Sequence, residues 1–337
     1  MTTTVAPPAV PKGPRAPRQL KAALEPSDRL FHGTATSVGM FVLIMTGAIG
    51  IFLGYQSIPT LRHYGLSFFT QTQWQPELDK IGIAAVLVGT VEVALVAMVV
   101  AFPLALMMAL FITDYAPKRI KSYLISAIDL MAAVPSIIYG LWGFFLLQPH
   151  AILVARWLSQ YLGWIPIFHV DTDPNAAVWQ QSRYTSSAFI AGLAVSMMAI
   201  PLACALMRAV FDQAPLGERE AAMALGGTRF GVARTVVLPF AKGGIVGGTM
   251  LALGRALGET AAVLIIISPA YVIKPRILEA GTQTTSALIA GNFGDATKSQ
   301  LSALLTAGFV LFLITLVVNS FAAVIIRRSR SGAATEL

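Results

Sequence analysis

The chain has 337 residues, of which 56% are hydrophobic and only 12% are charged. Soluble domains carry about 25% charged residues, so this composition excludes an ordinary soluble protein and indicates an integral membrane protein. The net charge of +8 would also suit a nucleic-acid-binding protein. Its lysines and arginines, however, lie in loops that flank apolar runs, a distribution that follows membrane orientation, so we expect no nucleic-acid partner.

Residues suited to a metal site or a disulfide are sparse. The one cysteine, Cys204, lies in an apolar run and allows no intramolecular disulfide. The four histidines are isolated in sequence, and none has metal-ligand spacing: His32, His63, His150 and His169. We therefore predict neither a metal site nor a cofactor.

Residues 1–30 are rich in proline, lysine and arginine, as in the segment PPAVPKGPRAPRQLK. Such a segment cannot bury a core, and it predicts a disordered, extended cytoplasmic tail. It does not resemble a signal peptide, because a long polar stretch precedes an apolar run that is long enough to span a membrane. Residues 31–330 then form the predicted transmembrane domain.

Six apolar runs are long enough to cross a bilayer, which takes about 20 helical residues. They cover about residues 33–55, 82–112, 122–147, 186–210, 243–268 and 300–326. The sequence therefore predicts an all-α integral membrane protein with six transmembrane helices.

The basic residues indicate how these helices are oriented. Most lysines and arginines fall in the N-terminal tail, in the connections after the second and fourth runs, and at the C-terminus. The positive-inside rule places these parts in the cytoplasm. We therefore predict a multi-pass protein of the cell (plasma) membrane, in contact with lipid and with both termini cytoplasmic.

The long connection at residues 148–185 falls on the predicted outer side. It contains the aromatic residues Trp157, Tyr161, Trp164 and Trp179. Aromatic side chains of this kind anchor membrane proteins at the lipid–water interface. A surface that receives an extracytoplasmic binding protein is the other interpretation of this connection.

Residues 218–239 form a polar connection on the predicted cytoplasmic side. From residue 220 it reads EAAMALGGTRFGVARTVVLP, with helix formers first, then Gly226-Gly227, and Pro239 at its end. Glycines supply the backbone angles of a sharp turn, and a proline cannot continue a helix interior. The pattern predicts a short helix, a turn and a second short helix that ends at Pro239. Such a module suits docking into a groove on another protein.

This stretch resembles the EAA loop of ABC-transporter importer permeases. The matching residues are Glu220, Ala221, Ala222, Gly226, Val236, Leu238 and Pro239. The family prefers isoleucine where this chain has Val236. The resemblance implies a type I ABC importer permease fold, and it implies that this loop couples the chain to an ATP-hydrolysing subunit. An amphipathic connector with an accidental spacing is the alternative.

Ionisable residues occur inside the predicted spans at Glu92, Asp129, Arg255 and Glu259. Each costs roughly 2.5–3.5 kcal/mol on insertion scales, so each needs a reason. Arg255 and Glu259 are four residues apart, which predicts that they share a helix face and can pair. A guanidinium offers planar, bidentate donors to an oxyanion, and the carboxylate would hold the arginine in place. A pair that merely neutralises itself between helices is the alternative.

Three further stretches resemble the phosphate ABC permeases. They are AAVPSIIYGLWG at residues 132–143, GRALGET at 254–260 and TTSALIAGNFGDA at 284–296. The resemblance assigns the substrate pathway to four residues: Arg255, Glu259, Thr260 and Ser136. It leaves Asp129 as either packing or polar lining. It gives no role to Glu92, which we expect to be protonated, paired or turned away from the pathway.

The substrate and partners follow from the same resemblance. Sulfate and molybdate permeases carry a related RALGE segment followed by phenylalanine, where this chain has Thr260. Arg255 and Glu259 alone thus imply an oxyanion, and residues 132–143 favour phosphate. The order of the motifs and the loop lengths, with the long basic N-terminal tail, resemble the PstC-type permease more than its PstA-type partner. The implied partners are that second permease subunit, an ATP-binding subunit dimer and an extracytoplasmic phosphate-binding protein.

The chain is not expected to be an enzyme itself. It contains no G-x-x-x-x-G-K-[ST] segment, so ATP hydrolysis would belong to the partner subunit. Two alternatives to a phosphate permease are open at this point. One is a permease for sulfate or molybdate. The other is an ion-coupled secondary transporter with Glu92, Asp129 and Glu259 as proton sites, which gives no reason for the EAA spacing.

Overall fold

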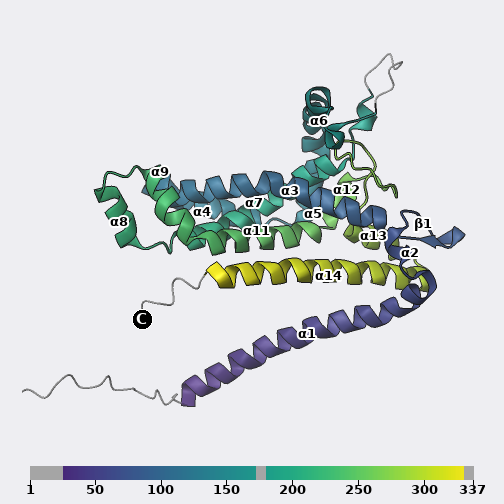
Figure 1. Cartoon of the computed structure of the whole chain (residues 1–337), viewed down its shortest axis with the longest axis horizontal. Coiled ribbons are helices and arrows are strands. Elements are labelled where there is room, and N and C mark those ends of the chain that lie inside the picture. Colours follow the sequence, from purple (N-terminus) through teal and green to yellow (C-terminus); the bar gives the residue numbers. More distant parts are fainter. Residues whose placement is uncertain (1–25, 172–179, 330–337) are drawn as a thin grey trace, which may run out of the picture. The chain divides into compact units, whose positions relative to one another are not determined.

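The computed structural model describes residues 26–171 and 180–329. The described chain is almost entirely helical, which confirms the all-α prediction (Figure 1). Compactness divides it into two units, residues 1–49 and residues 50–337. The predicted tail lies outside the described residues up to position 25, and residues 26–30 already belong to the first helix.

Helix α1 (Pro26–Tyr64) contains the first apolar run. The described part of the first unit, residues 26–49, consists of this helix alone. Its apolar side chains are exposed, for example Phe41 at 62% and Leu43 at 69%. A helix that is apolar on its exposed surface suits a lipid environment rather than water.

In the second unit the end of α1 packs against the start of the last helix, α14 (Lys298–Ser329). The hydroxyls of Thr60 and Ser302 are 2.8 Å apart, and the hydroxyl of Ser302 also donates to the carbonyl of Gln56. Polar side chains that are buried between two apolar helices are satisfied by such contacts.

A small hairpin follows α1. After α2 (Ser67–Thr70), β1 (Trp74–Gln75) pairs antiparallel with β2 (Lys80–Ile81) across a short 3-10 turn, η1 (Pro76–Leu78). The carboxylate of Asp79 accepts hydrogen bonds from the Tyr64 hydroxyl at 2.5 Å and from the His63 ring at 2.9 Å. These bonds fasten the hairpin to the end of α1.

The core of the second unit is built on α3 (Ala84–Leu110) and α7 (Ala188–Phe211), which pack along each other. Helix α11 (Lys242–Leu257) packs on both, and α14 packs on α11 (Figure 1). Small residues allow this close approach: a Cβ on Gly192 would lie 2.5 Å from a methyl carbon of Val96. Close packing of small residues is the usual means of helix association in lipid.

The predicted third span, residues 122–147, is not one helix. It is divided into α4 (Lys118–Ala133) and α5 (Ser136–Trp142), with Val134 and Pro135 extended between them. A residue that precedes proline is disfavoured in the helical region, which explains the position of the break. The helix continues from α5 through a π-helical turn, η3 (Gly143–Leu147), into α6 (Gln148–Leu162). The candidate membrane span here is therefore Ser136–Leu162.

The predicted fifth span, residues 243–268, is interrupted as well. Helix α11 ends at Leu257, and α12 (Ala261–Ile266) begins after Gly258, Glu259 and Thr260. Before α11, the helical run Arg229–Phe240 meets it at an angle of 72°. Within the described ranges five helices are long and apolar enough to cross a membrane, or six if this bent pair is one span. The sequence predicted six.

The remaining elements are short. They are η2 (Phe111–Tyr115), η4 (Pro166–Phe168), η5 (Gln181–Arg183), α8 (Leu216–Ala224), α9 (Arg229–Val232), η6 (Ala233–Val237), α10 (Leu238–Phe240) and α13 (Thr285–Asn292).

Candidate functional site

The polar connection after α7 folds as a helix, a turn and a second helical run, as predicted. Helix α8 ends just before Gly226, which has a φ of +84°, a left-handed conformation that glycine adopts without strain. The hydroxyl of Thr228 accepts a hydrogen bond from the Gly231 amide at 3.1 Å and caps the second run. We call this connection, residues 216–240, the coupling segment, after the role that the sequence analysis predicted for it.

The end of the coupling segment differs slightly from the prediction. The second run comprises α9, η6 and α10, and it ends at Phe240 rather than at Pro239. Pro239 lies near the start of α10, directly after the π-helical turn η6. A π-helical turn alters the backbone hydrogen-bond pattern, which lets the run include a residue without an amide hydrogen. The chain then bends into α11 around Ala241.

The coupling segment presents large apolar side chains to its surroundings. Leu225 is 90% exposed, Leu216 73%, Phe230 64% and Met223 52%. Four of the predicted coupling residues are exposed on the same segment, namely Glu220, Ala221, Gly226 and Pro239, whereas Ala222 and Leu238 are partly buried. Exposed apolar side chains gathered on one short segment are typical of a surface that another protein covers.

The inner side of α8 is held by an ion pair that the sequence analysis missed. Arg219 donates to a carboxylate oxygen of Asp114 at 2.8 Å, and it donates a second hydrogen bond to the carbonyl of Phe211. The two charged side chains are only 14% and 12% exposed. Asp114 lies in η2 at the end of α3, and Phe211 ends α7. One arginine thus joins α8 to both core helices.

No local pattern could have identified this pair, because its partners are 105 positions apart in the chain. Two weaker ion pairs lie near the same ends of the helices. Lys121 and Asp212 are 3.4 Å apart, and Arg208 and Asp129 are 3.9 Å apart. Both join α4 to α7. Asp129 is therefore a partner in a helix-packing contact, and its side chain is 56% exposed.

Three of the four residues that were predicted to line a pathway lie at the break between α11 and α12. Arg255 lies in the last turn of α11 and is exposed, whereas Glu259 is only 7% exposed. The expectation that the two share one helix face is wrong, because α11 ends at Leu257 between them. No ion pair joins them in the described structure. The Glu259 carboxylate instead accepts a hydrogen bond from the Ala262 amide at 3.1 Å.

Glu259 therefore caps the first turn of α12. A carboxylate at that position satisfies a free backbone amide and complements the positive end of the helix. The Thr260 hydroxyl donates to the carbonyl of Gly258 at 3.2 Å, inside the break. Arg255 remains as the exposed charge beside these internally bonded groups.

The three stretches singled out in the sequence meet at this break. Gly140 in α5 lies so close to α12 that a Cβ there would be 2.7 Å from the Cα of Ala262. The hydroxyl of Ser286 in α13 donates to the carbonyl of Glu259 at 2.7 Å. Ser136, the first residue of α5, is partly buried on the neighbouring element. Two interrupted helices, α4–α5 and α11–α12, are therefore adjacent.

A buried polar cluster connects α13 to α3, and the sequence identified its α13 side only by resemblance. The Thr90 hydroxyl accepts a hydrogen bond from the Thr285 amide at 2.9 Å and lies 3.0 Å from the Thr285 hydroxyl. A Cβ on Gly89 would lie 2.3 Å from the carbonyl of Gln283. The start of α13 is thus fixed against α3 by hydroxyl contacts and by a glycine.

Glu92 in α3 is partly buried and lines a small cavity together with Lys274. Lys274 is paired with Glu279 at 2.8 Å. Across the parts of the chain that the structure describes, no ion pair or hydrogen bond of the Glu92 carboxylate occurs. Of the three possibilities raised for Glu92, pairing is therefore not observed.

Comparisons with known proteins connect this geometry to a family. Residues 101–331 match the family described as binding-protein-dependent transport system inner membrane component. The chain is 36% identical over 331 residues to the phosphate transport system permease protein PstC of Xylella fastidiosa, covering 97% of this chain and 98% of that protein. It is 38% identical over 299 residues to PstC 2 of Mycobacterium tuberculosis, covering 88% and 90% respectively.

The fold also resembles a solved structure, a bacterial alginate ABC transporter in complex with an alginate pentasaccharide-bound periplasmic protein. The TM-score is 0.58 at 16% sequence identity, and the likeness covers 90% of this chain and 96% of that chain. At this identity the likeness concerns the fold alone. It confirms the predicted ABC importer permease fold.

Proposed function

The chain belongs to the family of binding-protein-dependent transport system inner membrane components, and from this premise we propose that it is a permease subunit of an ATP-driven importer of inorganic phosphate. It forms half of the translocation pathway beside a second, PstA-type permease subunit. ATP hydrolysis belongs to an ATP-binding subunit dimer, and an extracytoplasmic phosphate-binding protein delivers the substrate. The coupling segment and both termini lie in the cytoplasm, as the basic residues indicate.

The observation that carries this proposal is the convergence of the three phosphate-permease-like stretches at the break between α11 and α12. There an exposed arginine, Arg255, adjoins a carboxylate that is already engaged, since Glu259 caps α12. The charge of Arg255 is therefore not cancelled by a direct partner within the described residues. A guanidinium in that state offers planar donors to an oxyanion that has lost water.

The roles of the other pathway residues follow from their positions. Ser136 and Thr260 supply hydroxyls at the start of α5 and inside the break. Glu259 fixes the shape of the break through its bond to the Ala262 amide. In transporters, substrate sites form where helices are discontinuous, because the interrupted backbone leaves polar groups for the substrate. The paired interruptions in α4–α5 and α11–α12 match that arrangement.

ATP hydrolysis is coupled to transport by helices that move as rigid bodies. The exposed apolar residues of the coupling segment dock on the ATP-binding subunit, and Arg219 transfers displacement of α8 to the ends of α3 and α7. Closure of the ATP-binding dimer then moves these helices as a body and changes which side of the membrane the pathway faces.

The test is uptake of labelled phosphate by cells that lack this chain, with the wild-type chain restored and labelled sulfate as the control. Loss of phosphate uptake that the wild-type chain restores, with sulfate uptake unchanged, is the expected result. If sulfate uptake depends on the chain and phosphate uptake does not, the substrate assignment is wrong. If uptake persists when the ATP-binding subunit is inactivated, the chain is an ion-coupled transporter instead.

A further inference from the structure

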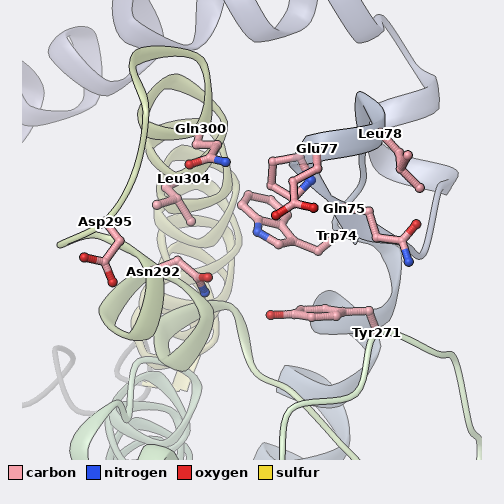
Figure 2. Close-up of a pocket in the computed structure, with 10 residues that line it drawn as sticks. Trp74, Gln75, Glu77, Leu78, Tyr271, Asn292, Asp295, Gln300 and Leu304 are labelled. Carbon is pink, nitrogen blue, oxygen red and sulfur yellow. The ribbon is translucent and has the colours of Figure 1, made fainter.

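A cavity of about 570 Å³ lies at the end of the second unit that is opposite the coupling segment. On one side it is lined by Trp74 and Glu77 of the hairpin together with Tyr271 (Figure 2). On the other side it is lined by Asn292 and Asp295, and by Gln300 and Leu304 of α14. It therefore lies between the hairpin and the start of α14, outside the residues assigned to the pathway.

The lining of this cavity favours a positively charged organic group. Glu77 and Asp295 each carry a carboxylate, the lining contains no lysine or arginine, and neither carboxylate belongs to an ion pair in the described structure. The rings of Trp74 and Tyr271 face the same space from the hairpin side (Figure 2). Aromatic faces and carboxylates together bind ammonium and guanidinium groups.

Trp74 adds a hydrogen-bond donor to this lining. It is only 7% exposed, and its indole N–H makes no hydrogen bond within the described residues. An indole N–H is a hydrogen-bond donor only, so beside a cavity it can donate to an acceptor on a ligand. A peptide that places a basic side chain between the carboxylates can supply that acceptor with a backbone carbonyl.

We propose that this cavity is a docking pocket for a lysine or arginine side chain of the extracytoplasmic binding protein. The inference rests on the proposed function, which places this end of the molecule outside the cell membrane. A metal ion is not favoured, because no group of three or more potential ligands occurs in the described ranges. A lipid amine would bring a phosphate group, and the lining holds two carboxylates and no cation to receive it.

The test uses the complete transporter, purified and reconstituted in vesicles, and measures ATP hydrolysis against the concentration of phosphate-loaded binding protein. The double variant Glu77→Gln/Asp295→Asn should raise the half-saturating concentration about tenfold, the loss expected when two ion pairs to one cation are removed while the aromatic contacts remain. The maximal rate should be unchanged. Asp171→Asn is the matched control, because it removes one carboxylate at the same end of the molecule, outside the pocket.

Salt gives an independent readout. Raising the ionic strength from about 0.1 M to about 1 M shortens the range of charge attraction, so it should raise the half-saturating concentration of the wild type more than that of the double variant. Unchanged half-saturation in the double variant would overturn the pocket assignment. The pocket assignment would also be overturned if the double variant lost activity only when the phosphatidylethanolamine content of the vesicles was changed. That result would assign the pocket to a lipid amine.

These outcomes are distinguishable from failure of the proposed function. If the binding protein stimulates the wild type and phosphate is transported, the proposed function stands whichever way the pocket variants behave. If phosphate-loaded binding protein does not stimulate the wild-type transporter at any concentration, the proposed function falls and the occupant proposed for the pocket falls with it.

Discussion

The coupling segment and the break between α11 and α12 arrange charge in opposite ways. In the coupling segment Arg219 is largely shielded from solvent and paired with Asp114, and apolar side chains such as Leu225 are exposed. At the break Arg255 is exposed, and the buried carboxylate of Glu259 is bonded to backbone. The difference teaches that burial and pairing, rather than residue type, separate an arginine that positions a helix from one that can bind a ligand.

The comparison also separates substitutions that should weaken folding and assembly from substitutions that should weaken transport alone. Removing one member of a buried ion pair leaves an unpaired buried charge, which is costly, whereas removing an exposed charge changes folding little. Substitutions at Arg219 should therefore act on assembly, and substitutions at Arg255 should act on transport. The predictions below test this division, beginning with the largest expected effect.

Arg219→Ala should destabilise the coupling segment most, by roughly 3–5 kcal/mol, because Asp114 is left buried without its partner. The variant should lose co-purification with the ATP-binding subunit. The matched test is the exchanged pair Asp114→Arg/Arg219→Asp, which should recover part of the loss, since the charges can pair again. An exchanged pair that behaves like the sum of the two single variants would show that the pair does not couple the helices.

Gly140→Ala should separate α5 from α12, because the added Cβ would lie 2.7 Å from backbone of Ala262. Overpacking of this kind costs about 1–3 kcal/mol, and here it would also move the break that carries Arg255. Thermal unfolding and phosphate uptake measure the two effects. Gly47→Ala is the control, because nothing lies within 4 Å of the Cβ that it adds. If Gly140→Ala and Gly47→Ala had the same unfolding temperature and the same phosphate uptake, the close contact between α5 and α12 would not position the break.

Leu225→Ser/Phe230→Ser should weaken assembly with the ATP-binding subunit about tenfold while leaving the stability of the isolated chain nearly unchanged. The reason is that both side chains are exposed, and in the proposed assembly they contact the ATP-binding subunit rather than the core. Leu66→Ser provides the comparison, because Leu66 is 82% exposed at the opposite end of the second unit. Assembly that responds equally to all three positions would argue against a specific docking surface.

The smallest effect concerns acid stability. The hydrogen bond from Arg276 holds the pKa of Asp171 below its usual value, so the pair contributes stability above the unfolded pKa of about 3.9 and loses it as the pH falls through the lowered folded pKa. Asp171→Asn should therefore lower stability slightly at neutral pH, leave it unchanged at low pH, where Asp171 of the wild type is already protonated, and so flatten the acid side of the stability profile. Unfolding followed between about pH 5 and pH 2 measures this. If the stability of Asp171→Asn fell with decreasing pH as steeply as that of the wild type, the pair of Asp171 and Arg276 would contribute no stability.

Local sequence signals were sufficient for part of this molecule. The turn of the coupling segment could be predicted because it depends on Gly226. Pro135 marks the break between α4 and α5, but the third span was predicted as one continuous run. The break at residues 258–260 was missed, because its flanks are as apolar as a continuous span and one glycine does not end a helix by itself. The contact of Arg219 with Asp114 depends on how α3, α7 and α8 pack, which no local pattern encodes.

The central claim is that Arg255 passes the substrate while the coupling segment transmits the motion. It is tested most directly by measuring phosphate uptake and ATP hydrolysis together in vesicles that contain the complete transporter with Arg255→Ala, and with Arg62→Ala as the control for an exposed arginine elsewhere. The account predicts that Arg255→Ala lowers phosphate uptake about tenfold or more, the loss expected for charge-assisted hydrogen bonds, while binding-protein-stimulated hydrolysis continues. Undiminished uptake by Arg255→Ala would contradict it.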